Sequence, residues 1–331
     1  MIIPKSYEDK LDYKETEIYI KYVKDNFEAN LAENLNLLRV SAPLFVKNNS
    51  GLNDNLNGVE RPVSFDAKGI DENLEVVHSL AKWKRMALKR YDFKDMGIYT
   101  DMNAIRRDEE VDNLHSFYVD QWDWEKIVTK EERNLETLKD TVRKIVKTLK
   151  KTQDDLLEKC PKLEGFVSED VFFIDSQELE DMYPDKTPKE REDLLAKEKK
   201  TICIIGIGDK LRSGKPHDLR APDYDDWHLN CDILVYYPIL DRAIELSSMG
   251  IRVDRDSLLD QLNKTNHLER LALPFHKALM NDELPLTIGG GIGQSRLCMI
   301  LLNKAHIGEV QSCIWPSDTL KKAIEYNIHL L

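Results

Sequence analysis

Residues 286–302 read LTIGGGIGQSRLCMILL, and this stretch sets the expectations for the rest of the fold. Its apolar start, residues 286–288, predicts a strand. The glycines within residues 289–293 predict a turn, because a backbone without side-chain bulk bends freely and lets a nucleotide approach closely. Residues 297–302 predict an apolar helix whose first turn carries Arg296. An arginine at the start of a helix, beside glycines, favours a site for phosphate groups.

The glycine-rich stretch does not match the common nucleotide-binding motifs. Its spacing does not fit G-x-x-x-x-G-K-S/T, and no strand–helix–strand unit of the dinucleotide-binding type follows it. Taken alone, such a turn more often has a structural role than a functional one. The functional interpretation therefore depends on a second arginine and on an acidic pair elsewhere in the chain.

Arg106 supplies the second arginine, at the start of the charged run RRDEE. The stretch HSFYVDQWDWE at residues 115–125 follows it and alternates, which predicts a strand with Gln121, Asp123 and Glu125 on one face and two tryptophans on the other. Arg106 then lies on a loop between strands, where its guanidinium can clamp a phosphate. A solvated run of charges is the alternative interpretation.

Asp232 and Glu245 form the acidic pair. Residues 232–237 and 243–248 flank a turn that contains Pro238, and they predict two antiparallel strands. Both carboxylates stand among apolar neighbours, and a buried carboxylate needs a cation. A magnesium ion that bridges ATP phosphates would meet this need. Pairing with Arg252 or Arg242 is the structural alternative.

The remaining patterns place helices around an antiparallel sheet. They predict a helix over residues 13–36, a strand at 37–40, a helix capped by Ser79, a surface helix over 132–157, a helix that opens with a capping box at Thr187 and a buried strand at 201–205. The lysines and arginine of the helix after Ser79 are expected on a solvated face. The fold class is therefore α+β, a mainly antiparallel sheet flanked by helices, in a single domain over residues 1–331.

Composition narrows the function. The formal net charge of −12 argues against a protein that coats nucleic acid, so an anionic ligand must meet a local basic pocket. No signal peptide and no apolar run of about 20 residues is present, which predicts a cytoplasmic protein without membrane contact. The five cysteines are scattered without a Cys-x-x-Cys pair and indicate neither a disulfide framework nor a zinc site.

Longer strings of sequence resemble a known family. Arg106 on its loop, DILV at residues 232–235, ELSSMGIR at 245–252 and GGGIGQSR at 289–296 resemble the catalytic signatures of class II aminoacyl-tRNA synthetases of the aspartate/asparagine type. The strings NDNL at 53–56, VVHSLAKWKR at 76–85, VDQWDWE at 119–125 and RAPDYDDW at 220–227 are similar to those of ammonia-dependent aspartate–ammonia ligases. The resemblance covers roughly residues 13–316.

The resemblance implies a role for each matching position. Arg106 is expected to hold the α-phosphate of ATP and Arg296 to pack on the adenine or hold the outer phosphates. The implied magnesium ligands are Asp232 and Glu245. The implied contacts to ATP also include Ser116, Leu246 and Gly291, and the implied aspartate contacts are Asp54, Ser79, Lys84, Gln121, Asp123 and Arg252. Asp225 is expected to orient or deprotonate incoming ammonium.

One segment departs from the family pattern. Only residues 227–231 separate Asp226 from Asp232, where a longer loop is expected, and Cys231 stands where a small residue such as glycine is usual. This departure bears on how a loop closes over the site, and it leaves the ligands on either side in place.

The implied reaction joins aspartate to AMP and lets ammonia displace the AMP, giving asparagine. Free ammonia is the expected nitrogen donor, because a glutamine-using enzyme needs a cysteine nucleophile, whereas Ile2 follows Met1 and no cysteine lies in G-x-C-x-G. A tRNA-charging enzyme is one rival, but it needs an anticodon-reading domain ahead of the core. An inactive relative that serves as a binding or regulatory protein is the other. The resemblance also implies a homodimer through the first helix and the Pro43 strand.

Overall fold

The computed structural model describes residues 1–5, 7–54, 60–93 and 96–331. The strands are β1 (Leu37–Arg39), β2 (Phe45–Lys47), β3 (Ser64–Phe65), β4 (Leu74–Val76), β5 (Gly97–Ile105), β6 (Tyr118–Ile127), β7 (Val171–Asp175), β8 (Thr201–Ile205), β9 (Asp225–Tyr237), β10 (Arg242–Arg252) and β11 (Thr287–Gly293). The helices are α1 (Tyr13–Leu35), α2 (Ala81–Tyr91), α3 (Leu135–Lys159), α4 (Ser176–Met182), α5 (Pro188–Lys199), α6 (Arg255–Lys264), α7 (Pro274–Met280), α8 (Gln294–Leu301) and α9 (Ser317–Glu325), with short 3₁₀ turns η1 (Leu268–Ala272) and η2 (Ile307–Glu309).

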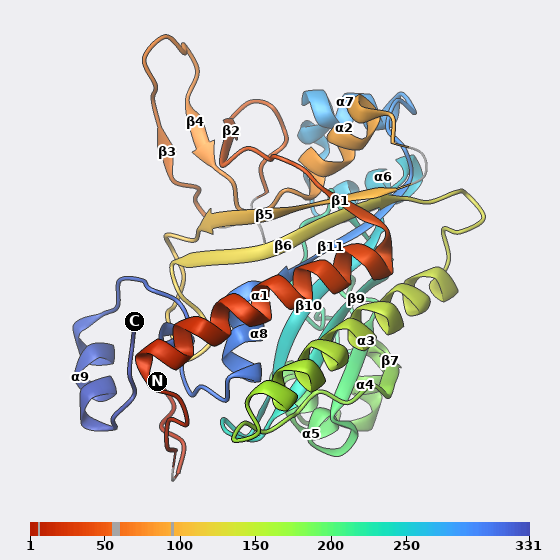
Figure 1. Ribbon diagram of the computed structural model, residues 1–331. Coiled ribbons are helices and arrows are strands. Elements are labelled where there is room, and N and C mark those ends of the chain that lie inside the picture. Colours follow the sequence, from red (N-terminus) through yellow and green to blue (C-terminus); the bar gives the residue numbers. More distant parts are fainter. Residues whose placement is uncertain (6, 55–59, 94–95) are drawn as a thin grey trace.

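One large sheet organises the molecule. Within the described residues its strand order is β1-β5-β6-β11-β10-β9-β8-β7, and a small sheet, β2-β4-β3, stands apart from it (Figure 1). Only the outermost pairs, β1 with β5 and β7 with β8, are parallel; the pairings between them are antiparallel. The predicted α+β class with a mainly antiparallel sheet is therefore confirmed.

The two faces of the sheet carry different side chains. On one face Trp122, Trp124, Ile233 and Ile292 join a core that α1, α3 and α8 cover (Figure 1). Because side chains alternate along a strand, the residues between them point to the other face. The predicted separation of tryptophans from acidic residues on β6 is thus correct, and the polar face is left for a site.

The glycine-rich stretch is a strand and not the predicted turn. Its residues pair with β6 from Thr287 to Gly293 on one side, and with β10 from Ile288 to Ile292 on the other. A Cβ atom at Gly289 would lie 2.1 Å from an oxygen of Glu125, and one at Gly291 would lie 2.4 Å from an oxygen of Gln121. The glycines are therefore needed because long polar side chains from β6 lie across them.

Three further local predictions need correction. The helix after Ser79 begins at Ala81 with Leu80 as its cap, and the Ser79 hydroxyl only accepts a bond from the Ala81 amide, at 3.1 Å. The cations in the first half of this helix, Lys82, Lys84 and Arg85, are buried rather than solvated. Residues 227–231 are no loop, because they continue β9 as part of one strand. The first helix, the β9–β10 pair and the capping box at Thr187 are confirmed.

Candidate active site

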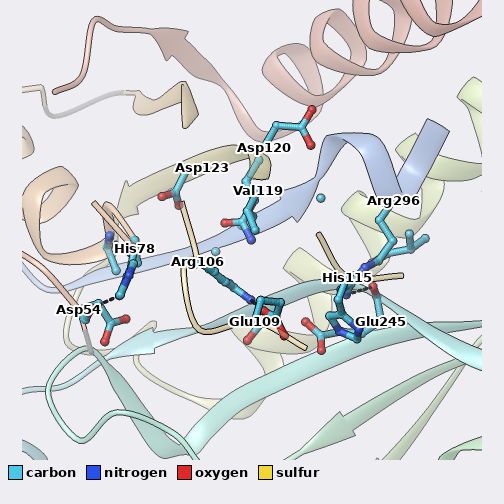
Figure 2. A pocket seen from close by; sticks show the side chains of 18 of the residues that line it. Asp54, His78, Arg106, Glu109, His115, Val119, Asp120, Asp123, Glu245 and Arg296 are labelled. Carbon is cyan, nitrogen blue, oxygen red and sulfur yellow. Dashed lines mark hydrogen bonds and ion pairs between the residues drawn. The ribbon is translucent and has the colours of Figure 1, made fainter. Parts of the chain in front are cut away.

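A cavity of about 500 Å³ opens on the polar face of the large sheet. Strands β6, β9, β10 and β11 form its floor, and the loop between β5 and β6 reaches over it with Arg106 (Figure 2). Most of the predicted site residues line this one cavity: Asp54, Ser79, Arg106, Ser116, Gln121, Asp123, Asp225, Glu245, Leu246, Arg252, Gly291 and Arg296. Lys84 and Asp232 are not among its lining residues and lie beside it, each bonded to a neighbouring charged side chain.

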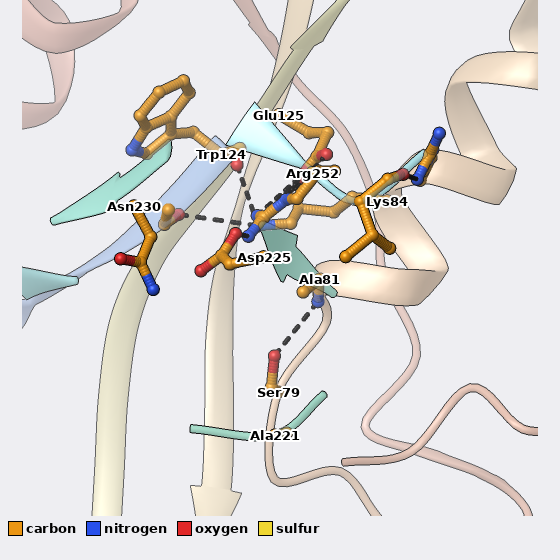
Figure 3. A network of polar contacts seen from close by, with 12 residues as sticks. Ser79, Ala81, Lys84, Trp124, Glu125, Ala221, Asp225, Asn230 and Arg252 are labelled. Atoms are coloured by element: carbon orange, nitrogen blue, oxygen red, sulfur yellow. Dashed lines mark hydrogen bonds and ion pairs between the residues drawn. The ribbon is translucent and has the colours of Figure 1, made fainter. Parts of the chain in front are cut away.

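Five buried charged residues form a paired cluster: Lys84, Asp123, Glu125, Asp225 and Arg252. Figure 3 shows four of them, Lys84, Glu125, Asp225 and Arg252. Arg252 donates from Nη2 to Glu125 at 2.7 Å and from Nη1 to Asp225. Burial alone would raise the pKa of Glu125, but Arg252 and Lys84 outweigh it and hold that pKa below its ordinary value. Glu125 is therefore a charged partner that fixes Arg252 at the cavity wall.

Lys84 supports the cluster from α2. Its ammonium donates to Asp123 and to the Trp124 carbonyl at 2.8 Å, and its side chain is fully buried. Burial lowers the pKa of Lys84, and Asp123 and Glu125 act against that shift. Asp123, by contrast, lines the cavity and also accepts from the Leu80 amide at 3.1 Å. Lys84 thus lies behind Asp123 and orients it.

Two arginines on the cavity wall, Arg106 and Arg296, are less fully paired with protein carboxylates than Arg252 is. We call them the open arginines. Arg106 pairs with the carboxylate of Glu109 at 3.6 Å, and its Nε has no hydrogen-bond partner among the described residues. Arg296, at the start of α8, donates to the backbone carbonyl of Glu245 at 2.8 Å. Because a carbonyl is neutral, this bond does not neutralise the positive charge of Arg296. Both arginines point toward the same hollow (Figure 2). A guanidinium in this state is suited to an anionic group from a ligand.

The acidic pair lies on adjacent strands beside a third arginine. Asp232 on β9 binds Arg220 through Oδ2, and its Oδ1 is buried without a partner among the described residues. Burial raises the pKa of Asp232 to about 7; Arg220 acts against that shift and Glu245 adds to it. The alternative partners predicted from sequence, Arg252 and Arg242, are therefore not the ones that Asp232 uses. An orphaned carboxylate oxygen next to a second carboxylate fits a hard divalent cation.

Several site residues escaped the sequence reasoning. Arg220 lines the cavity and binds Asp218 at 2.6 Å as well as Asp232. Glu125 was placed on the correct face without a role, and Glu109 was only part of a charge run. Arg220 stood inside the quoted string RAPDYDDW, so its neighbourhood of aspartates was the available signal. Within the string NDNL, residues 55 and 56 lie outside the described part of the chain.

A polar network supports the wall of the cavity next to Ser116. Asp120 lines the cavity, accepts from the Ser295 amide at 3.0 Å and from Lys24 of α1 at 2.9 Å. The Ser116 hydroxyl donates to Gln311, which lines the same wall. The first helix is thereby tied to the cavity through a charged contact. Within the described residues, no helix is long and apolar enough to cross a membrane.

The fold and the cavity define a class of protein. A large, mostly antiparallel sheet flanked by helices is also the fold of class II aminoacyl-tRNA synthetase catalytic cores, and solved structures agree. An asparaginyl-tRNA synthetase from Pyrococcus horikoshii, complexed with asparaginyl-adenylate, aligns with a TM-score of 0.64 at 15% identity over 91% of this chain and 70% of its own. One from Entamoeba histolytica aligns with a TM-score of 0.60 at 14% identity, over 90% of this chain and 66% of its own.

Closer relatives identify the family. The model of the aspartate-ammonia ligase family matches residues 14–327. Aspartate–ammonia ligases from Clostridium perfringens and Lactobacillus johnsonii are 63% and 58% identical to this chain, and each alignment covers 100% of this chain and 99% of the relative. The chain belongs to the aspartate–ammonia ligase family.

Proposed function

We propose that this protein makes asparagine from aspartate, ATP and ammonia, with β-aspartyl-AMP as the intermediate and AMP and pyrophosphate as the other products. The observation that carries the proposal is a single cavity that brings the paired cluster and the open arginines together. The cluster offers carboxylates and Arg252 to an amino acid, and the open arginines offer charge to a polyphosphate. Membership of the aspartate–ammonia ligase family supports the same activity.

In the first step, an oxygen of the side-chain carboxylate attacks the α-phosphorus of ATP. The bond from this phosphorus to pyrophosphate breaks, and pyrophosphate leaves. Negative charge grows on the α-phosphate oxygens, so a guanidinium placed there stabilises the transition state more than the ground state. We assign this role to Arg106, and we assign the outer phosphates or the adenine to Arg296. Ser116, Leu246 and Gly291 complete the wall on which the nucleotide would lie.

We assign aspartate to the part of the cavity lined by the paired cluster. Asp123 and Asp54 suit the α-ammonium of the substrate, Gln121 and Ser79 supply further polar contacts, and Arg252 suits a carboxylate. Lys84 acts through Asp123, because its ammonium is already surrounded by protein oxygens. Pre-formed ion pairs keep these groups in place before the substrate arrives, which lowers the cost of orienting it.

Asp232 and Glu245 are the residues that would hold Mg²⁺. The unpartnered Oδ1 of Asp232 supports this assignment, since burial of a bare carboxylate oxygen is otherwise costly. A magnesium ion bound there would neutralise phosphate charge. Arg220 binds Oδ2 of Asp232, which leaves Oδ1 as the oxygen that would bind the ion.

In the second step, ammonia attacks the acyl carbon of β-aspartyl-AMP. The bond from this carbon to the AMP oxygen breaks, and AMP leaves with the electron pair. Ammonia is the proposed donor because glutamine hydrolysis needs a nucleophile such as cysteine, and no cysteine is among the described residues that line the cavity. Asp225, which faces the cavity from β9, is proposed to orient the ammonium.

We also propose that two copies associate through α1 and the strands around Pro43. The exposed apolar side chains Leu38, Leu44 and Phe45 flank this proline and support the proposal, because burying them would be favourable. Light scattering tests it: a mass of one chain would contradict it. A cytoplasmic location and the absence of a tRNA partner stay predictions from the sequence.

One assay tests the proposed reaction. Purified protein is incubated with ATP, Mg²⁺ and aspartate, together with either ammonium or glutamine, and the nucleotide and amino-acid products are measured. AMP, pyrophosphate and asparagine are expected in equal amounts with ammonium. ADP as the nucleotide product would point to phosphoryl transfer and contradict the adenylate mechanism, and equal activity with glutamine would contradict the nitrogen source.

A further inference from the structure

His78 is a buried imidazole on the cavity wall, just ahead of α2 (Figure 2). Only 1% of its surface is exposed. Its Nδ1 lies 2.9 Å from the carbonyl oxygen of Asp54. A carbonyl oxygen only accepts hydrogen bonds, so Nδ1 carries the proton and Nε2 carries the lone pair. Nε2 is buried and has no hydrogen-bond partner among the described residues, so a basic nitrogen remains unused.

The imidazole is held in this orientation by the segment that carries Asp54. The Asn53 side-chain oxygen accepts from the His78 amide at 2.9 Å and from the Asp54 amide at 3.0 Å. The Asn53 side-chain nitrogen in turn donates to Glu75 at 3.1 Å. The His78 backbone and ring are thus both bonded to neighbouring residues, and the direction of Nε2 is fixed before any ligand binds.

The surroundings keep the ring neutral. Burial lowers the pKa of His78, the bond to the Asp54 carbonyl raises it, and the charge of Arg106 lowers it. Glu60 and Glu75 face the ring from the two segments beside it and raise the pKa by less, so the net shift is downward from 6.5. A neutral imidazole with a free lone pair at neutral pH is ready to accept a proton.

The place of His78 in the cavity matches one step of the proposed reaction, on which this inference rests. Asp54 and Ser79, which we assign to aspartate, are its bonded partner and its chain neighbour. Arg106, which we assign to the α-phosphate, is close enough to influence its charge, and it lies between the His78 side and the Arg296 side of the hollow (Figure 2). The acyl carbon of β-aspartyl-AMP joins these two parts of the ligand, so His78 faces the region where nitrogen must attack.

We propose that Nε2 of His78 is the general base that removes a proton from bound ammonium. The ammonium N–H bond breaks, the proton moves to Nε2, and the freed electron pair of ammonia forms the bond to the acyl carbon. The bond from that carbon to the AMP oxygen breaks, and AMP takes its electron pair. A second proton leaves the new amide nitrogen for the released phosphate or for water. His78 then returns its proton to solvent after the products leave.

Asp225 is less suited to this proton transfer. Its Oδ1 accepts from Arg252 in the paired cluster, so a proton on this carboxyl would compete with a buried ion pair. Its remaining oxygen suits the orientation of a cation. The two roles that the sequence combined in Asp225, orienting and deprotonating ammonium, therefore separate between Asp225 and His78.

The variant His78→Asn isolates Nε2. The asparagine amide can take the place of Nδ1 and donate to the Asp54 carbonyl, but it offers no nitrogen lone pair at Nε2. Asparagine synthesis from ammonium should fall by on the order of 10²-fold or more. Hydroxylamine is largely unprotonated at neutral pH, so formation of aspartyl hydroxamate should change only a few-fold. Aspartate-dependent exchange between ATP and pyrophosphate, which precedes the nitrogen step, should also persist.

His115→Asn is the matched control, because His115 lines the same cavity and bonds Asp112 through Nδ1 at 2.9 Å. Its ratio of ammonium to hydroxylamine activity should equal that of the wild type. The proposal is overturned if His78→Asn lowers ammonium and hydroxylamine activities equally, or leaves ammonium activity intact. Failure of wild-type protein to catalyse the exchange would instead contradict the proposed function.

The pH dependence of wild-type protein gives a test without a variant. With His78 as base, kcat/KM for total ammonium should stay level through neutral pH and fall only below the lowered pKa of the imidazole. An enzyme that only captures free ammonia from solution would show a tenfold rise per pH unit across the same range, which contradicts the proposal. In His78→Asn we expect the level region to be replaced by that rise.

Discussion

Arg252 and Arg106 line one cavity, yet they differ in burial and in how closely protein carboxylates pair with them. The guanidinium of Arg252 is bonded to Glu125 and Asp225 inside the paired cluster and is 3% exposed. The guanidinium of Arg106 pairs at 3.6 Å with Glu109, and the Arg106 side chain is 24% exposed. A buried charge with protein partners serves structure and binding together, whereas an open charge is reserved for a ligand. Substitutions in the two regions should therefore separate stability from activity.

Arg252→Leu should produce the largest effect, because it removes the cation that binds both Glu125 and Asp225 in the protein interior. We expect the free energy of unfolding to fall by roughly 3–5 kcal/mol, as measured by urea denaturation. Arg255→Leu is the control, since Arg255 pairs with Asp282 at 3.2 Å at an exposed position. Equal stability losses in the two variants would show that the paired cluster is not the stabilising unit.

Arg106→Gln should show the opposite separation. Its loss removes a charge that stabilises the transition state of adenylation, so aspartate-dependent exchange between ATP and pyrophosphate should slow by on the order of 10²–10³-fold. The free energy of unfolding should change by less than about 1 kcal/mol, because Arg106 has few protein partners. Arg107→Gln, at the exposed neighbouring arginine, should affect neither quantity. A large stability loss in Arg106→Gln would contradict the contrast between the two regions.

Glu309 is a buried carboxyl that forms no ion pair within 4 Å among the described residues, although Lys304 is near enough to act on its pKa. Glu309 lies two residues after Ile307, which lines the cavity. Its Oε1 accepts a hydrogen bond from the Tyr7 hydroxyl at 2.7 Å. Burial raises the pKa of Glu309 from 4.5 to about 7. The folded state then binds the proton more tightly than the unfolded state, so the stabilisation is complete below about pH 4.5 and lost as pH rises through about 7. The span corresponds to about 3 kcal/mol.

Glu309→Gln should remove this pH dependence. Urea denaturation at about pH 5 and about pH 8 should show a smaller loss of stability between the two values in the variant than in the wild type. Tyr7→Phe serves as control, because it removes a hydrogen bond to Glu309 and keeps the titrating carboxyl. An unchanged pH slope in Glu309→Gln would mean that this carboxyl is ionised in the folded protein across the range.

Local sequence patterns predicted much of the fold, and the predictions that were wrong share a cause. The stripe of α1 and the alternation on β6 report which side is buried, so they predicted helix, strand and face correctly. The glycines of β11 misled because their role depends on Gln121 and Glu125 from a strand far away in sequence. A local sequence pattern does not indicate which side chains from distant strands will lie across a glycine.

The site shows the same limit. Most residues that the family resemblance predicted for the site do line one cavity. The resemblance did not predict which charged side chains would pair with one another. Lys84 looks like a solvated lysine on a helix until the fold places it beneath Asp123. The partner of Asp232 proved to be Arg220, twelve residues earlier, because the chain folds back before β9 begins. The unused nitrogen of His78 likewise depends on a bond to a carbonyl that no motif encodes.

The smallest expected effect concerns the ion pair between Arg61 and Asp108, which lies near the protein surface. Arg61 donates to Asp108 from Nε at 3.0 Å and from its backbone amide at 3.1 Å. The pair links the chain just before β3 to the loop that carries Arg106. Water and salt screen it, since the Arg61 side chain is 69% exposed.

Asp108→Arg should raise KM for aspartate by roughly two-fold at low salt, and combining it with Arg61→Asp should restore the wild-type value. Added salt should remove the difference between the single variant and the wild type, because the charges of the pair act through solvent. The midpoint of urea unfolding should stay the same in both proteins. If the single variant instead lost as much activity as Arg106→Gln, this exposed pair would have to position Arg106 itself. Burial would then no longer distinguish the charges that matter for the protein's structure from those that serve the ligand.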